Sequence, residues 1–223
     1  MSKTLFIRAI TRFLAGLLMV AALLFIPAGT CDYPQGWLLI GILFAPMFVA
    51  GLVMMKKNPE LLKKRLNVKE EESEQRRVIY LSGLMFLAAF ISAGLSFRYG
   101  LLMLPFSISI IAAILFLAAY ALYAEVLREN TYLSRTVEVQ EDQKVIDTGL
   151  YGIVRHPMYM ATLVLFLTMP LVLGSVVSFI IILFYIPIIV KRIRNEELVL
   201  GKGLPGYVEY MAKVKYRLIP FIW

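Results

Sequence analysis

The uncharged run from Met158 to Val190, MYMATLVLFLTMPLVLGSVVSFIIILFYIPIIV, decides how this chain folds. Its 33 residues would make a straight helix roughly 50 Å long at ~1.5 Å per residue. The hydrocarbon core of a bilayer is only ~30 Å thick. Pro170 and the pair Gly174-Ser175 interrupt the run near its middle, where a helix can end and turn. We therefore expect a helical hairpin with two arms of about 16 residues each, which are marginal for a full crossing.

The preceding sequence contains further apolar stretches, each about as long as the ~20 residues that cross a bilayer. They are Ala9–Ala28, Trp37–Met55, Val78–Phe97 and Leu101–Ala124. The whole chain is 60% hydrophobic and 17% charged, whereas a soluble domain has about 25% charged residues. We expect an all-α polytopic membrane protein with four spanning helices and the hairpin, about six crossings. Residues 1–124 would form a membrane scaffold, and residues 125–223 a catalytic region.

The distribution of lysine and arginine predicts the orientation. If the N-terminus is cytosolic, the four inside segments hold three, eight, four and seven basic residues, which is 22 of the 23, and Arg98 alone lies outside. Cytosolic loops carry such an excess of positive charge. A single crossing by the Met158–Val190 run would place the last seven basic residues outside, so the charges favour the hairpin. Both termini are predicted to be cytosolic.

Composition argues against several classes of function. Cys31 is the only cysteine and His156 the only histidine, so a zinc site within this chain is not expected. The spans carry no ionisable residue near their middle, where ion-coupled transporters usually have one. The net charge of +8 follows from the inside segments, so we predict no nucleic-acid partner. In the basic connector Lys56–Arg77, Asn58 is expected to cap a short helix that begins at Pro59.

Polar residues gather on either side of the hairpin, and its return would make them neighbours. The first cluster is Gly149–Tyr159, GLYGIVRHPMY, and the second is Lys191–Glu197, KRIRNEE. Pro157 suits the first position of a helix, so unpaired N–H groups and the positive dipole end should face this boundary. Such a helix start can hold a carboxylate or a phosphate, and Arg155 adds a permanent charge.

Spacing within the second cluster is open to a simpler interpretation. Arg192 with Glu196, and Arg194 with Glu197, are pairs about one helical turn apart. Ordinary interfacial ion pairs, together with a structural histidine, explain this pattern as well as a catalytic site does.

The order of motifs from Ser134 to the end resembles the isoprenylcysteine carboxyl methyltransferase family and its phospholipid methyltransferase relatives. That family has an Arg-His-Pro-x-Tyr motif, a later Glu-Glu pair, paired tyrosines and a closing Arg-Leu-x-Pro. The corresponding residues here are Arg155–Tyr159, Glu196-Glu197, Tyr207, Tyr210 and Arg217–Pro220. The segment Gly201–Gly206 departs from the family, which often has Phe-Gly there. This departure suggests a bacterial-type branch, and hence an integral protein of the inner (cell) membrane with its site facing the cytosol.

The resemblance implies direct in-line methyl transfer from S-adenosyl-L-methionine to a lipid-like or prenylated substrate. By this analogy the cofactor-binding residues are Tyr151, His156, Pro157, Tyr159, Glu196, Tyr207 and Tyr210. The catalytic candidates are Arg155, Arg192, Arg194 and Glu197. The arginines would orient a carboxylate acceptor, whereas either glutamate could act as a base toward a phospholipid amine. The sequence leaves the choice between these acceptors open.

Two other functions remain possible at this stage: a membrane sterol or isoprenoid reductase that uses NADPH, and a non-catalytic membrane protein. We further expect Arg155, His156 and Glu196 to be accessible to water or lipid headgroups. Their truncation should then cost folding only about 1 kcal/mol.

Overall fold

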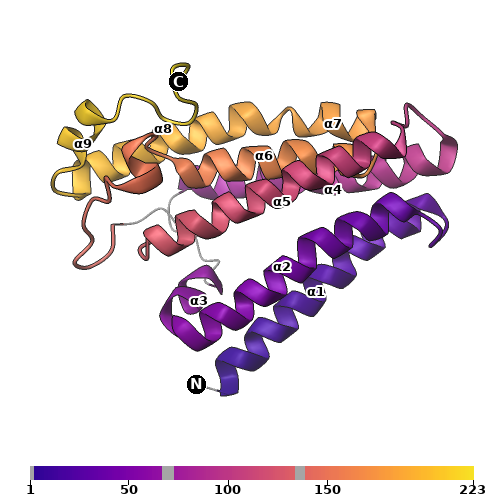
Figure 1. Ribbon diagram of the computed structural model, residues 1–223, viewed down its shortest axis with the longest axis horizontal. Helices are drawn as coiled ribbons and strands as arrows, with labels where there is room; N and C mark the ends of the chain where they lie inside the picture. Colours follow the sequence, from indigo (N-terminus) through magenta and orange to yellow (C-terminus); the bar gives the residue numbers. More distant parts are fainter. Residues whose placement is uncertain (1–2, 67–72, 134–138) are drawn as a thin grey trace.

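The computed structural model describes residues 3–66, 73–133 and 139–223, and in these ranges the regular elements are helices (Figure 1). The long helices are α1 (Lys3–Ala28), α2 (Pro34–Lys57), α4 (Ser73–Tyr99), α5 (Phe106–Glu129) and α8 (Tyr185–Gly203). The shorter elements are α3 (Pro59–Leu66), the 3₁₀ turn η1 (Gly149–Gly152), α6 (Pro157–Val172), α7 (Val176–Ile182) and α9 (Tyr207–Lys213). The predicted all-α class is confirmed for the described residues.

Within the described ranges, five helical segments are long and apolar enough to cross a membrane. Four of them, α1, α2, the part of α4 from Arg76 onward, and α5, correspond to the four predicted spans. The last span begins later than expected: α5 starts at Phe106 rather than at Leu101, because Pro105 takes the N-cap position. The fifth segment, Val176–Gly203, joins α7 and α8.

The hairpin is confirmed, but its arms are unequal. The first arm is α6, and Pro170 lies inside it without ending it. The turn comes at Gly174, which has a φ of +71° that a side chain would strain. Ser175 then caps α7 by accepting a hydrogen bond from the Ser178 N–H at 3.1 Å. The second arm does not stop at Val190, because α8 continues through the polar cluster as far as Gly203.

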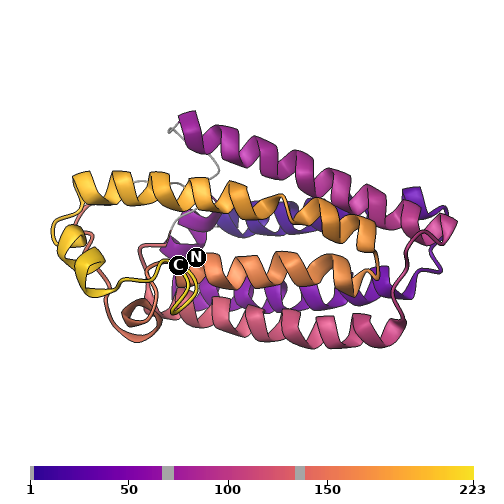
Figure 2. The ribbon, with the colours of Figure 1, turned by 90° about the horizontal axis from the view of Figure 1, so that it is seen from above.

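Helices α5 to α8 run roughly along the long axis of the molecule, and α1 and α2 lie beside each other at an incline to them (Figures 1 and 2). Helix α6 packs against α5, and α4 packs against α1, α7 and α8. A single large core of buried apolar residues joins these helices, whereas residues of and around α9 form a small separate cluster. The fold therefore holds the polar connectors at one end of a tightly packed bundle.

Both ends of the chain lie toward the same end of the bundle, where α3 and α9 also lie (Figure 1). The predicted cap of α3 is present, since Asn58 Oδ1 accepts a hydrogen bond from the Leu61 N–H at 3.0 Å. The cytosolic orientation of this end stays a prediction from the basic residues.

Candidate active site

The two polar clusters meet at the start of α6. His156 is its N-cap, with φ −127° and ψ 61°, and Pro157 takes the first helical position. The neighbouring cluster lies on α8, where Glu196 and Glu197 follow each other. Tyr159 donates a hydrogen bond to Glu196, and Arg155 bonds Glu197, so α8 is joined directly to the start of α6. The predicted proximity of the clusters is confirmed.

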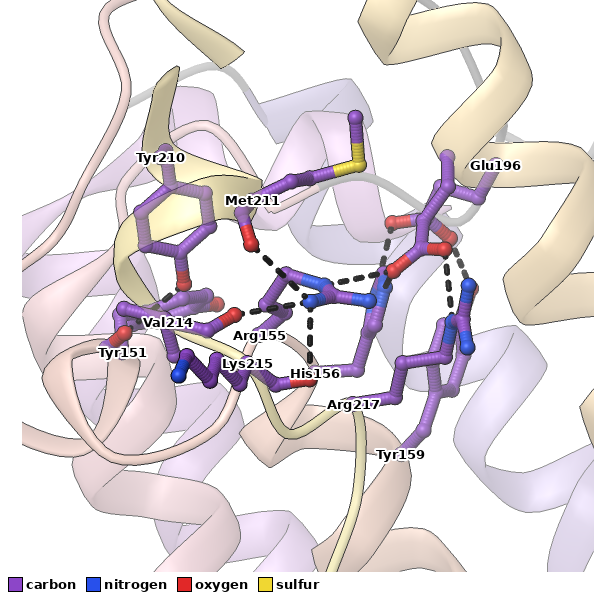
Figure 3. Close-up of polar contacts among 11 residues, drawn as sticks. Tyr151, Arg155, His156, Tyr159, Glu196, Tyr210, Met211, Val214, Lys215 and Arg217 are labelled. Carbon is purple, nitrogen blue, oxygen red and sulfur yellow. Dashed lines mark hydrogen bonds and ion pairs between the residues drawn. The ribbon is translucent and has the colours of Figure 1, made fainter. Parts of the chain in front are cut away.

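Arg155 is buried and forms the centre of the polar network (Figure 3). Its Nε donates to Glu197 Oε1 at 2.7 Å. Its Nη1 donates to the carbonyl oxygens of Val214 at 2.8 Å and Lys215 at 3.1 Å, with that of Met211 at 3.5 Å. Arg155 therefore joins α6, α8 and the segment after α9. Because a guanidinium carries five donors in a fixed fork, it suits this bridging role better than a lysine would.

Glu197 is surrounded by positive and polar groups. Besides Arg155, the Nε of Arg217 donates to its Oε2 at 2.7 Å, and His156 Nε2 lies 3.3 Å from its Oε1. The Glu197 side chain is 8% exposed. Burying a carboxylate is costly unless it is paired and hydrogen-bonded, and both conditions are met here. Glu197 thus pairs with Arg155 and Arg217 instead of Arg194, which lies exposed on α8.

Glu196 faces a different environment. It accepts a hydrogen bond from the Tyr159 hydroxyl, which in turn accepts one from Arg192 Nε at 2.9 Å. The guanidinium of Arg192 also lies 5.9 Å from the centre of the Tyr159 ring. His156 Nδ1 is 3.9 Å from Glu196 Oε1. The Glu196 side chain is 20% exposed, so it is more accessible than Glu197.

The opposite wall is built from the end of α5 and from η1. Glu129 accepts a hydrogen bond from the Leu150 N–H at 3.1 Å, and Asn130 Nδ2 donates to the Tyr151 hydroxyl at 3.1 Å. Gly149 has a φ of +50°, and a Cβ there would lie 1.8 Å from a Glu129 carboxylate oxygen. The positive φ favours glycine here, and any larger residue would also force the Glu129 carboxylate to move.

A pocket of about 90 Å³ opens between these walls, with room for several water molecules. Its polar lining includes Arg192, Glu196 and the aromatic residues Tyr151, Tyr159, Tyr207 and Tyr210. The buried hydroxyl of Tyr207 has no hydrogen-bond partner among the described residues. Burial raises the pKa of Tyr207, as do the charges of Glu196 and Glu197, so this phenol stays a neutral donor.

The pocket gathers most of the residues singled out from the sequence. Eight of them line it: Tyr151, Arg155, His156, Tyr159, Arg192, Glu196, Tyr207 and Tyr210. The other three, Pro157, Glu197 and Arg194, are not in its lining. Glu197 contacts the lining through Arg155 and His156, whereas Arg194 is exposed and takes no part in the network that Figure 3 draws.

The motifs missed several residues of the lining. They are Asn130, Tyr132, Leu133, Gln143, Lys144, Val145, Ile146, Met158, Leu200 and Leu204. Leu200 lies on α8 four residues after Glu196, so the helical repeat could have indicated it. Asn130 and the 143–146 segment carry no such signal, because only the fold of the connector brings them to the pocket.

The expectation that Arg155 and His156 are accessible to water is wrong. They are 7% and 5% exposed, because the chain after α9 covers them. The backbone N–H groups of Arg155 and His156 donate to the carbonyls of Tyr216 and Arg217, each at 2.9 Å. The Glu196 side chain, at 20% exposed, comes closer to the accessibility expected of it. Among the described residues, no group of three His, Cys, Asp or Glu side chains is placed to hold a metal ion.

The Arg155–Tyr159 motif and the Glu196-Glu197 pair, which the resemblance singled out, thus lie together. Residues 110–202 match the isoprenylcysteine carboxyl methyltransferase (ICMT) family. The ICMT match runs from α5 to the end of α8 and includes both polar clusters. It confirms the resemblance to this family. Tyr207, Tyr210 and Arg217 lie beyond the matched region.

A second comparison finds a reductase. The chain is 29% identical to the Delta(14)-sterol reductase TM7SF2 of Mus musculus over 91 residues, which are 40% of this chain. The aligned region is 22% of the reductase, so the chain spans about a fifth of the length of this relative.

Proposed function

We propose that this protein is a membrane methyltransferase that uses S-adenosyl-L-methionine and acts on a lipid-like or prenylated acceptor. The observation that carries the proposal is the pocket in which Glu196, Tyr159 and Arg192 form one hydrogen-bonded chain beside the start of α6. The ICMT match over the same residues supports it. When bound, S-adenosyl-L-methionine would supply a methyl group on a sulfonium centre, which passes to an in-line nucleophile while S-adenosylhomocysteine leaves.

The residues of the pocket fit such a cofactor. Glu196 is an acceptor for an ammonium group, and Arg192 is a donor for a carboxylate. Among the described residues, the Tyr207 hydroxyl is a buried donor without a partner, which an oxygen of the cofactor would satisfy. The apolar side chains for an adenine ring are Val145, Ile146, Leu200 and Leu204.

Catalysis would come from positioning, which is worth ~7–11 kcal/mol when the reacting groups are held in line. Arg155 would hold Glu197 and the 211–215 segment in place rather than touch the acceptor, because its Nε and Nη1 are already engaged. Arg192 and Glu196 line the pocket. Arg192 would orient a carboxylate acceptor, or Glu196 would take the proton from an amine acceptor.

A transfer assay tests the proposal. Purified protein in proteoliposomes of total bacterial lipid, with a prenylated cysteine added in a parallel sample, is incubated with methyl-tritiated S-adenosyl-L-methionine. We expect radioactivity to move into the organic extract in one of the two samples, with less transfer by Glu196→Gln. Radioactivity that stays in the aqueous phase in both samples would contradict the proposal.

The second candidate is an NADPH-dependent sterol or isoprenoid reductase, which the similarity to the mouse reductase favours. A reductase would oxidise NADPH when a sterol with a conjugated double bond is added, and the absorbance of NADPH at ~340 nm would fall. The methyltransferase proposal predicts no such loss.

A further inference from the structure

The last six residues, 218–223, fold into a closed loop after the site segment. The backbone N–H groups of Leu218 and Ile219 both donate to the Trp223 carbonyl oxygen, at 2.9 and 3.0 Å. Trp223 N–H returns a bond to the Ile219 carbonyl at 3.1 Å. Arg217 lies over the Trp223 ring at 5.4 Å, and the rings of Tyr216 and Phe221 are 5.4 Å apart. These contacts give the loop a defined shape.

The loop lies at the depth where the spanning helices begin. Leu218 is buried in the main core that the spanning helices share, and Trp223 packs against the same core. The carbonyls of Tyr216 and Arg217 are bonded to the residues directly before α6. In Figure 1 the C-terminus stands out sideways from the bundle near the start of α6, whereas α9 lies farther out at the end of the molecule. The loop is therefore at the boundary between the apolar bundle and the polar connectors.

Two large apolar side chains point out of this loop. Phe221 is 87% exposed, the highest value for a large apolar side chain among the described residues, and Ile222 is 78% exposed. Phe221 also has a φ of +66°, a conformation that costs energy for a bulky residue. Such strained positions occur where a side chain has a role outside the fold's own packing. Lys215, three residues before the loop, is also exposed and carries a positive charge.

We propose that the 218–223 loop is a lipid-binding anchor, with Phe221 and Ile222 inserted at the headgroup boundary of the bilayer. Moving exposed apolar side chains from water into the bilayer boundary is favourable, and an exposed lysine close in the sequence favours anionic headgroups. Arg217 joins the loop to the site, because it bonds Glu197 and lies over Trp223. Lipid contact thus holds the Arg217–Glu197 part of the network that supports the pocket at the membrane surface. The inference goes beyond the proposed reaction and does not depend on it.

Fluorescence quenching tests the anchor without an activity assay. The chain has two tryptophans, Trp37 and Trp223. Replacing both with phenylalanine and introducing Phe221→Trp gives one reporter in the loop. Two further single-tryptophan variants serve as references. One carries Glu209→Trp at an exposed position of α9, and the other keeps Trp37, which is 54% exposed on the spanning helix α2. Each protein is reconstituted in vesicles of phosphatidylcholine and phosphatidylglycerol, with or without lipids brominated near the headgroup end of the acyl chain.

We expect the Phe221→Trp reporter to be quenched by brominated lipid as Trp37 is, and to be protected from aqueous iodide. The Glu209→Trp reporter should show the reverse. Iodide quenching of Phe221→Trp as strong as that of Glu209→Trp, with no effect of brominated lipid, would overturn the proposal. If Phe221→Trp does not elute as a single species, Ile222→Trp in the same background carries the same test.

Discussion

At the scale of single residues, the adjacent Glu196 and Glu197 have different surroundings. Glu197 is held by Arg155, Arg217 and His156, whereas Glu196 faces the pocket and bonds Tyr159. The sequence gives no reason to distinguish them, because consecutive glutamates differ only in which side of α8 they occupy. The structure assigns the first to the pocket and the second to the network that supports it.

Glu196→Gln should weaken binding of S-adenosylhomocysteine while leaving folding almost unchanged. A hydrogen bond to a charged group contributes about 1.5–3 kcal/mol, so the dissociation constant should rise roughly ten- to a hundredfold. Titration calorimetry measures the affinity, and thermal melting in detergent measures stability. Glu209→Gln, on an exposed part of α9, serves as the control and should change neither quantity. Unchanged affinity in Glu196→Gln would remove Glu196 from the cofactor site.

Arg155→Ala should instead destabilise the protein. The substitution leaves the buried Glu197 without one of its cations and frees the carbonyls of Val214 and Lys215. Removing one partner of a buried ion pair costs about 3–5 kcal/mol. The melting temperature in detergent should therefore fall by many degrees, and Arg155→Lys should recover only part of the loss. The exposed Arg194→Ala is the control. Melting of Arg155→Ala at the wild-type temperature would show that the bridge has no structural role.

At the scale of elements, the hairpin depends on its turn. Gly174 combines a positive φ with close neighbours, since a Cβ there would lie 3.3 Å from the Met103 side chain and 3.5 Å from the Leu104 carbonyl oxygen. Gly174→Ala should cost about 1–2 kcal/mol, the cost of the left-handed conformation for a residue with a side chain. Thermal melting checks this.

Gly83→Ala is the matched control for the turn, because a Cβ at this position on α4 has no other group within 4 Å. It should be neutral or slightly stabilising, as alanine is favoured over glycine in a helix. Equal melting of Gly174→Ala and Gly83→Ala would contradict the role of the turn.

Much of the helical arrangement follows from the apolar pattern, and the rest depends on contacts that the pattern does not contain. The length of the 158–190 run, Pro170 and the Gly174-Ser175 pair predicted two antiparallel arms, and so the meeting of the polar clusters, although Pro170 lies within α6 and the turn comes at Gly174. Burial of Arg155 could not be predicted, because it results from the chain after α9 folding back onto the start of α6. The same holds for Asn130 and Lys144, which reach the pocket from a connector without periodic sequence.

At the scale of the whole molecule, both chain ends lie toward one end of the bundle, and 22 of 23 basic residues were assigned to one side. Fusions test the orientation: a fluorescent protein that matures only in the cytosol should be bright at either terminus. Alkaline phosphatase, which is active only outside, should be inactive at both. The Arg98 connection provides the control, because alkaline phosphatase inserted there should be active. Activity at the C-terminus would contradict the hairpin as a pair of crossings.

The proposed methyl transfer requires that S-adenosyl-L-methionine, rather than NADPH, occupies the pocket. Titration calorimetry of the detergent-purified protein with S-adenosylhomocysteine, and separately with NADPH, tests this most directly. We predict saturable binding of S-adenosylhomocysteine that Glu196→Gln weakens and Glu209→Gln does not, and no binding of NADPH. Saturable binding of NADPH, with no heat from S-adenosylhomocysteine, would contradict the methyltransferase proposal and favour the reductase.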